Sequence, residues 1–167
     1  MALRSRLEAI AETINDLVLA AEEKYWESRE MMTAGRPGAG IYLTGYAAEM
    51  LLKTAVFRVD GASLGDPVRP RLRPARRTGS IAFPSVRDEG YHSLLFWCHL
   101  LLYWRRRRPV VAWDPAFRND FLRRVRRLYS MWWVEMRYRP DRTTAPEAED
   151  VLDLASWLRA NYPRLWR

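Results

Sequence analysis

Apolar residues recur at steps of four and three along the start of the chain, which is the spacing of one face of an amphipathic helix. The positions of this stripe are Leu3, Leu7, Ile10, Ile14, Leu17 and Ala21. The stripe predicts a long helix to about Met32, where the glycine- and proline-rich segment AGRPGAG ends it. The following stretch, from about Ala39 to Val59, is apolar on most sides and therefore predicts a central, buried helix.

Three further helices are predicted in the second half. One spans about Tyr91 to Arg106, and the next starts with Asp114 as its N-cap and Pro115 at its first position. The apolar stripe of that helix comprises Phe117, Phe121, Val125, Leu128, Trp132 and Met136. Thr144 and Glu147 have the spacing of a capping box, which predicts the start of a last helix to about Asn161.

Residues 61–90 differ from the rest because proline, glycine and arginine dominate them and no helical period is evident. They predict a long Arg/Pro-rich loop, of the kind that is usually functional or disordered in a compact domain. With the elements around this loop, the sequence predicts an all-α fold, a five-helix bundle formed by a single domain over residues 1–167.

Composition adds a strong positive charge to this picture. The chain has 28 basic and 20 acidic residues, for a net charge of +8, and nearly all of the basic residues are arginine. Arginine presents a planar fork that binds phosphates and carboxylates. Cys98 is the sole cysteine, so no internal disulfide can form, which fits a reducing cytoplasm. No secretory signal pattern and no apolar run of membrane-spanning length is present, so we expect a cytoplasmic protein with no membrane partner.

The segment GYAAEMLLKTAVF, residues 45–57, combines a glycine with a single pair of charges in an apolar helix. Gly45 removes a side chain where another helix could cross closely. Glu49 precedes Lys53 by four residues, which is the favourable order for an ion pair on one helix. The residues alone leave two interpretations open: an ordinary core helix with a satisfied ion pair, or a functional site.

Three segments resemble motifs of the HEPN superfamily, a group of small helical domains. YLTGYAAEMLLKTAVF resembles the signature of its second helix, GYHSLLFW the start of its third, and MRYRP, which contains Arg137 and Tyr138, a segment near the end of its fourth. The resemblance implies a helical bundle that forms a homodimer. It also implies either a ribonuclease, a toxin partner of a small nucleotidyltransferase, or a binding module that has lost catalysis.

The resemblance further implies where catalytic residues would lie. Catalytic HEPN domains carry an arginine followed, after four to six residues, by a histidine near the end of the last core helix. Arg137 matches the arginine, but residues 142–144 are Arg, Thr and Thr, which argues against this site. Arg87 and His92 have the same spacing in the loop before the third helix, so they are weak catalytic candidates. The alternative is that His92 caps that helix. Two histidines make a poor metal site, and we predict neither a metal nor a cofactor.

Arginine runs interleaved with tryptophan are the other candidate for function. Residues 105–108 are all arginine, and further arginines follow between 118 and 127, with Trp104 and Trp113 among them. Such mixtures can follow a phosphate backbone and stack bases. The alternative is a solvated helix face around core tryptophans, partly neutralised by acidic residues of the same fold.

We therefore predict a HEPN-like module that binds nucleotide or RNA, is non-catalytic and belongs to a toxin–antitoxin or defence system. The predicted binding residues are Glu49, Lys53, His92, Arg105, Arg106, Arg124, Arg127, Arg137 and Tyr138. Two alternatives remain: a dimeric interaction or scaffold protein that binds no nucleic acid, and a metal-independent ribonuclease that uses Arg87 and His92.

Overall fold

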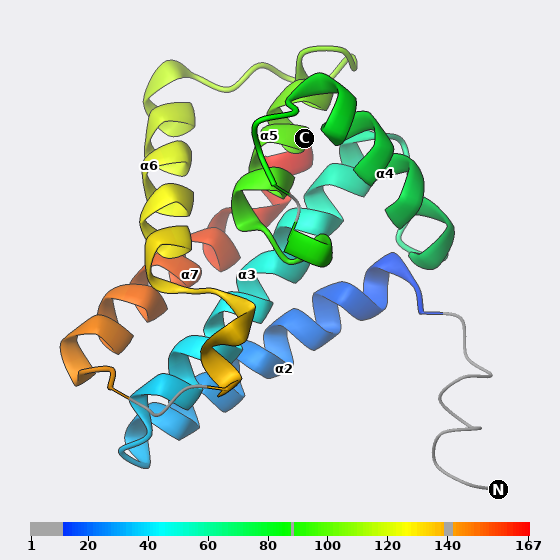
Figure 1. Cartoon of the computed structure of the whole chain (residues 1–167). Helices are drawn as coiled ribbons and strands as arrows, with labels where there is room; N and C mark the ends of the chain where they lie inside the picture. Colours follow the sequence, from blue (N-terminus) through cyan, green and yellow to red (C-terminus); the bar gives the residue numbers. More distant parts are fainter. Residues whose placement is uncertain (1–11, 88, 139–141) are drawn as a thin grey trace, which may run out of the picture.

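The structure is a computed structural model that describes residues 12–87, 89–138 and 142–167, without the side chains of Arg137 and Tyr138. In these ranges the chain forms six α-helices and two short 3-10 helices, with no β-strand (Figure 1). The elements are α2 (Ile14–Thr33), α3 (Pro37–Val59), α4 (Arg69–Ala82), η1 (Glu89–Tyr91), α5 (Leu94–Arg105), α6 (Pro115–Met131), η2 (Val134–Tyr138) and α7 (Ala145–Trp166).

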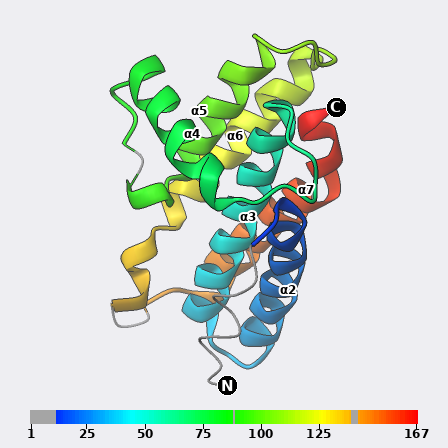
Figure 2. The ribbon, with the colours of Figure 1, turned by 90° about the vertical axis from the view of Figure 1, so that its right-hand side faces the viewer.

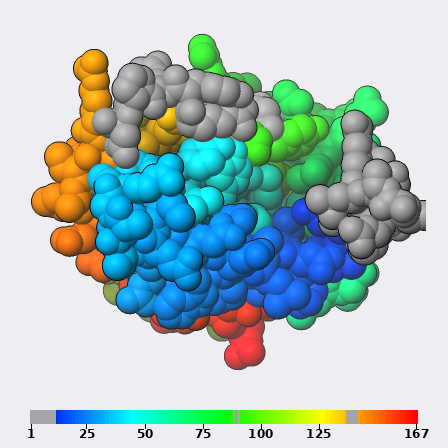
Figure 3. All heavy atoms as spheres, turned by 90° about the horizontal axis from the view of Figure 1, so that it is seen from below, coloured from blue at the N-terminus to red at the C-terminus, as the bar shows by residue number. Residues whose placement is uncertain are grey.

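Helix α3 is the centre of the bundle, as its apolar sequence predicts. Its residues Leu52, Ala55 and Phe57 are at most 1% exposed. Helix α2 packs along one side of α3, and α5 and α7 pack on others (Figure 1). Helices α4, α5 and α6 lie together at one end of the molecule (Figure 2). Seen from below, α2 covers much of the surface beside the first turns of α3 (Figure 3).

Two predicted helix starts are confirmed by their capping hydrogen bonds. The side chain of Asp114 accepts from the backbone N–H of Phe117 at 2.8 Å, at the start of α6. Thr144 and Glu147 form the reciprocal bonds of a capping box at the start of α7. These bonds satisfy backbone donors that the first helical turn leaves without an intrahelical partner.

The prediction of a loop over residues 61–90, and with it a five-helix bundle, is wrong because this region contains α4. The core face of α4 is formed by Leu72, Ala75 and Gly79, which follow Val68 at helical spacing. Two of these residues are too small to stand out as an apolar stripe. Gly79 is required there, since a Cβ would overlap the ring of Phe96 on α5. Proline and arginine at the other positions hide the period further.

Three predicted helix boundaries are also wrong, and α7 extends past its predicted end at Asn161 to Trp166. Helix α2 begins at Ile14 and not near Leu3, because Thr13 has an extended backbone and caps the helix; Leu3, Leu7 and Ile10 lie outside the described residues. Helix α6 ends at Met131, where Trp132 turns the chain into η2, so its stripe does not reach Met136.

The third predicted helix, α5, begins at Leu94 and not at Tyr91. Its N-cap is Ser93, whose side chain accepts from the backbone N–H of Phe96. His92 therefore does not cap this helix, and its side chain is available for another contact.

No helix among the described residues is long and apolar enough to cross a membrane.

Candidate functional site

Glu49 is the centre of a buried cluster of charged groups. Its side chain is only 2% exposed, and its Oε1 accepts a hydrogen bond from Nζ of Lys53 at 2.5 Å. Its other oxygen, Oε2, lies 3.0 Å from Nδ1 of His92. A buried carboxylate is very unfavourable unless it is paired and hydrogen-bonded, so both partners are needed. The predicted pairing of Glu49 and Lys53 is confirmed, and His92 joins it.

Tertiary packing brings His92 to this carboxylate. The indole N–H of the buried Trp97 donates to the backbone carbonyl of Tyr91 at 2.8 Å, which holds the chain just before His92. The ring of His92 also meets the ring of Tyr46 edge to face, with centroids 5.7 Å apart. The His92 side chain remains 36% exposed. The cluster therefore presents one oriented imidazole at the surface, backed by a buried carboxylate.

The glycine of this segment makes room for an aromatic ring. A Cβ at Gly45 would overlap the indole of Trp132, which follows α6. The indole N–H of Trp132 donates to the carbonyl of Tyr42 at 3.1 Å, and its ring meets the ring of Tyr46. The predicted close approach is confirmed, but the neighbour is a side chain and not the backbone of a crossing helix. Trp132 thus supports Tyr46, which in turn contacts His92.

Among the described residues, the side chain of Arg87, the other residue proposed for catalysis, forms no hydrogen bond or ion pair with His92, whose partner is Glu49. Arg87 is exposed in the segment before η1. The hydroxyl of Tyr129 donates to Glu89 at 2.7 Å, which raises the pKa of Tyr129, and the charge of Arg87 partly offsets this rise. His99 lies on α5 against the ring of Phe83. Partial burial, and secondarily the charge of Arg126, lower the pKa of His99 from its ordinary value. His99 lies within α5 and His92 precedes it, so the two histidines are not on one helix.

Most arginines of the runs singled out in the sequence serve the fold. Arg105 donates to the backbone carbonyls of Leu165 and Arg167 at 2.8 and 2.9 Å, near the end of α7. Its guanidinium lies over the ring of Trp113 at 4.3 Å from the centroid. Burial lowers the pKa of Arg105 to about 10. This side chain anchors the end of α7 and is poorly placed to bind a ligand.

Acidic residues neutralise three further arginines of these runs. Arg108 pairs with Asp60 at 2.6 Å, Arg124 with Asp120 at 2.9 Å and Arg127 with Asp150 at 2.9 Å. Arg106 is exposed and has no carboxylate partner in the described part of the chain. Neutralisation by acids of the same fold was one of the two interpretations of the sequence. A phosphate-binding role of Arg106, Arg124 and Arg127 stays a prediction.

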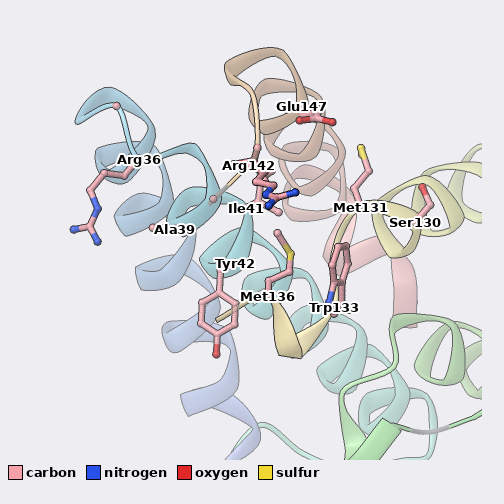
Figure 4. Close-up of a pocket in the computed structure, with 13 residues that line it drawn as sticks. Arg36, Ala39, Ile41, Tyr42, Ser130, Met131, Trp133, Met136, Arg142 and Glu147 are labelled. Carbon is pink, nitrogen blue, oxygen red and sulfur yellow. The ribbon is translucent and has the colours of Figure 1, made fainter. Parts of the chain in front are cut away.

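A surface pocket of about 1090 Å³ lies between the start of α3, the end of α6, η2 and the start of α7 (Figure 4). Its lining is largely apolar and aromatic, with Tyr42, Trp133 and Met136 close together and Arg142 beside them. The segment that resembles the HEPN catalytic region borders this pocket. The side chains of Arg137 and Tyr138, which belong to that segment, lie outside the described residues.

The pocket and the charged cluster are connected through aromatic side chains of α3. The hydroxyl of Tyr42, which lines the pocket, donates to the hydroxyl of Tyr46 at 3.1 Å. Tyr46 contacts His92, as described above.

Metal ligands do not gather among the described residues, where no group of three His, Cys, Asp or Glu side chains could hold an ion. Cys98 is buried as a free thiol, and burial raises its pKa to about 12.

Comparison of the chain with known proteins finds no matching family model, no matching curated protein and no matching solved structure. Membership of the HEPN superfamily therefore stays a prediction from three short segments.

Proposed function

We propose that this protein is an RNA-binding module and that His92 contacts the bound strand. The observation that carries the proposal is the contact of the buried Glu49 with His92, which holds an imidazole in a defined orientation at the surface of a protein with a net charge of +8. Such a charge attracts a polyanion, and an oriented imidazole supplies a hydrogen-bond donor or acceptor for phosphate or ribose. The HEPN resemblance favours RNA as the polyanion.

The two histidines of the chain provide a matched test. We expect His92→Gln to weaken binding of a labelled single-stranded RNA about tenfold or more, because a hydrogen bond to a charged group contributes about 1.5–3 kcal/mol. His99→Gln removes the other histidine, which packs against Phe83, and is expected to leave the affinity unchanged. Equal affinities for all three proteins would contradict a role of His92. Absence of RNA binding by the wild type would favour the scaffold function.

Metal-independent RNA cleavage is a second candidate function, and the contact at Nδ1 of His92 favours it. A carboxylate only accepts, so Nδ1 carries the hydrogen and the neutral ring has its lone pair on Nε2. Nε2 would take the proton of a ribose 2′-hydroxyl, and the 2′-oxygen would attack phosphorus. The bond from phosphorus to the 5′-oxygen would then break, and the proton would pass to that oxygen. The products are a 2′,3′-cyclic phosphate and a 5′-hydroxyl.

In this candidate Arg87 would hold the phosphate, as its spacing from His92 suggested. The test is incubation of labelled RNA with the protein in the presence of EDTA, followed by analysis of the fragment ends. Fragments that carry cyclic phosphate in the wild type and are absent with His92→Gln would support cleavage. Intact RNA that is nevertheless bound would leave the non-catalytic module as the function.

We further propose a homodimer, and a small nucleotidyltransferase as partner in a toxin–antitoxin or defence system. The resemblance supports the partner, and an apolar surface on α2 supports the dimer. Leu19 and Trp26 are seven residues apart on this helix and are 59% and 47% exposed. Light scattering at micromolar concentration tests the dimer, which Leu19→Glu should dissociate. A monomeric wild type would contradict it.

A further inference from the structure

Helix α4 carries an excess of positive charge that nothing on the helix balances. Its sequence RPRLRPARRTGSIA contains five arginines and no acidic residue. The remaining positions are apolar, small or uncharged polar residues. Like charges at helical neighbour positions repel one another and destabilise the helix.

Four of these arginines lie on one face of α4. At 3.6 residues per turn, Arg69, Arg73, Arg76 and Arg77 fall within about 100° of arc. A different face of the helix packs on the core, where Ala75 and Gly79 are buried. This packing fixes the rotation of α4, and all four arginines are exposed. They are referred to below as the arginine face.

The arginines of α4 differ from those of α6 in their carboxylate partners. On α6, Asp120 pairs with Arg124, and Asp150 of α7 pairs with Arg127. On α4, Arg71 pairs with Asp66 and lies outside the arginine face. No ion pair with a carboxylate of the described residues involves Arg69, Arg73 or Arg77.

The arginine face ends close to the charged cluster. The guanidinium of Arg76 lies over the ring of Tyr91, 5.0 Å from its centroid. The carbonyl of Tyr91 is held by Trp97, and His92 follows in the chain. Figure 2 shows α4 and α5 side by side, with the segment between them at one edge of the molecule. A strand that lies on α4 can therefore extend toward the exposed side chain of His92.

We propose that the arginine face of α4 binds the phosphate backbone of RNA and directs the strand to His92. The proposal rests on the proposed function and assigns its binding surface. Residues four apart rise about 6 Å along a helix, which lets Arg69, Arg73 and Arg77 reach successive phosphates of a strand. Guanidinium groups bind phosphate oxygens through paired, charge-assisted hydrogen bonds. Bound phosphates of the RNA offset the repulsion between the arginines of α4.

The experiment compares two double variants that change the net charge equally. Arg73→Gln with Arg77→Gln alters the arginine face, and Arg118→Gln with Arg123→Gln alters α6, where Arg123 pairs with Asp120. Binding of a fluorescein-labelled single-stranded RNA of mixed sequence is measured between low and moderate salt. Circular dichroism checks that each variant keeps its helix content.

We expect the α4 variant to lose about tenfold or more in affinity at low salt, and the α6 variant to lose far less. Each lost phosphate contact on a single strand should lower the slope of log K against log salt by about 0.7, so the α4 variant should show a slope smaller by about 1.4. Equal losses in the two variants would overturn the proposal, because net charge alone would then explain binding.

Three other outcomes are equally decisive. RNA binding by the wild type that neither variant weakens would overturn the assigned surface and leave the proposed function standing. No RNA binding by the wild type would overturn both. Tighter binding to vesicles of anionic phospholipid than to RNA, lost in the α4 variant, would overturn the proposal in favour of a membrane surface.

Discussion

Oε2 of Glu49 and Nδ1 of His92 lie 3.0 Å apart although 43 residues separate them in the chain. Lys53 pairs with the other oxygen of the same carboxylate. Glu49 therefore contacts both the partner of a buried ion pair and an imidazole at the surface. We expect this arrangement to make stability and the proposed function separable, because changes at Lys53 act on the buried charge and changes at His92 act on the exposed group.

Lys53→Met is expected to destabilise the protein by about 3–5 kcal/mol, because it leaves a buried carboxylate with one partner fewer. Chemical denaturation measures this change. Lys24 provides the control, since it pairs with Glu27 at 2.7 Å on the surface of α2. Lys24→Met should cost less than about 1 kcal/mol. Similar effects of the two substitutions would contradict the account of the cluster.

Gly45→Ala is expected to destabilise the protein, although alanine favours a helix over glycine by up to about 1 kcal/mol. The added methyl would overlap the indole of Trp132, and overpacking of this kind costs about 1–3 kcal/mol. Gly65 has open space around the position of a Cβ, so Gly65→Ala should be neutral or slightly stabilising. A higher melting temperature for Gly45→Ala would show that Trp132 does not require the glycine.

His99 predicts a pH dependence of stability. Its pKa is lowered in the folded protein, so between the folded and the ordinary value the unfolded chain binds more protons. The contribution of His99 to stability is therefore fully present above about pH 6.5 and is lost as the pH falls through the lowered pKa. Denaturation of the wild type and His99→Gln at several pH values between 7.5 and 5 isolates this contribution. Parallel pH curves for the two proteins would contradict it.

The sequence predicts those parts of the fold that local chemistry determines. Asp114 and Thr144 mark helix starts because each side chain caps the backbone three residues ahead. The order and spacing of Glu49 and Lys53 likewise indicate their pairing. In each case the interacting residues lie within one helical turn of one another.

The missed features depend on packing between distant segments. Helix α4 is hidden because Ala75 and Gly79, which face the core, are too small to form an apolar stripe, and Gly79 leaves room for the ring of Phe96. The end of α6 depends on Trp132, whose indole fits over Gly45. The contact of His92 with Glu49 likewise requires the packing of Trp97, and no spacing in the sequence indicates it.

The most direct test of the central claim is the salt dependence of RNA binding by the wild-type protein. Labelled single-stranded RNA is titrated with protein at a series of salt concentrations, and log K is plotted against log salt. An RNA-binding module that neutralises phosphates predicts a linear fall with a slope of about −0.7 for each phosphate contact. No binding at low salt, or an affinity that does not change with salt, would contradict the account.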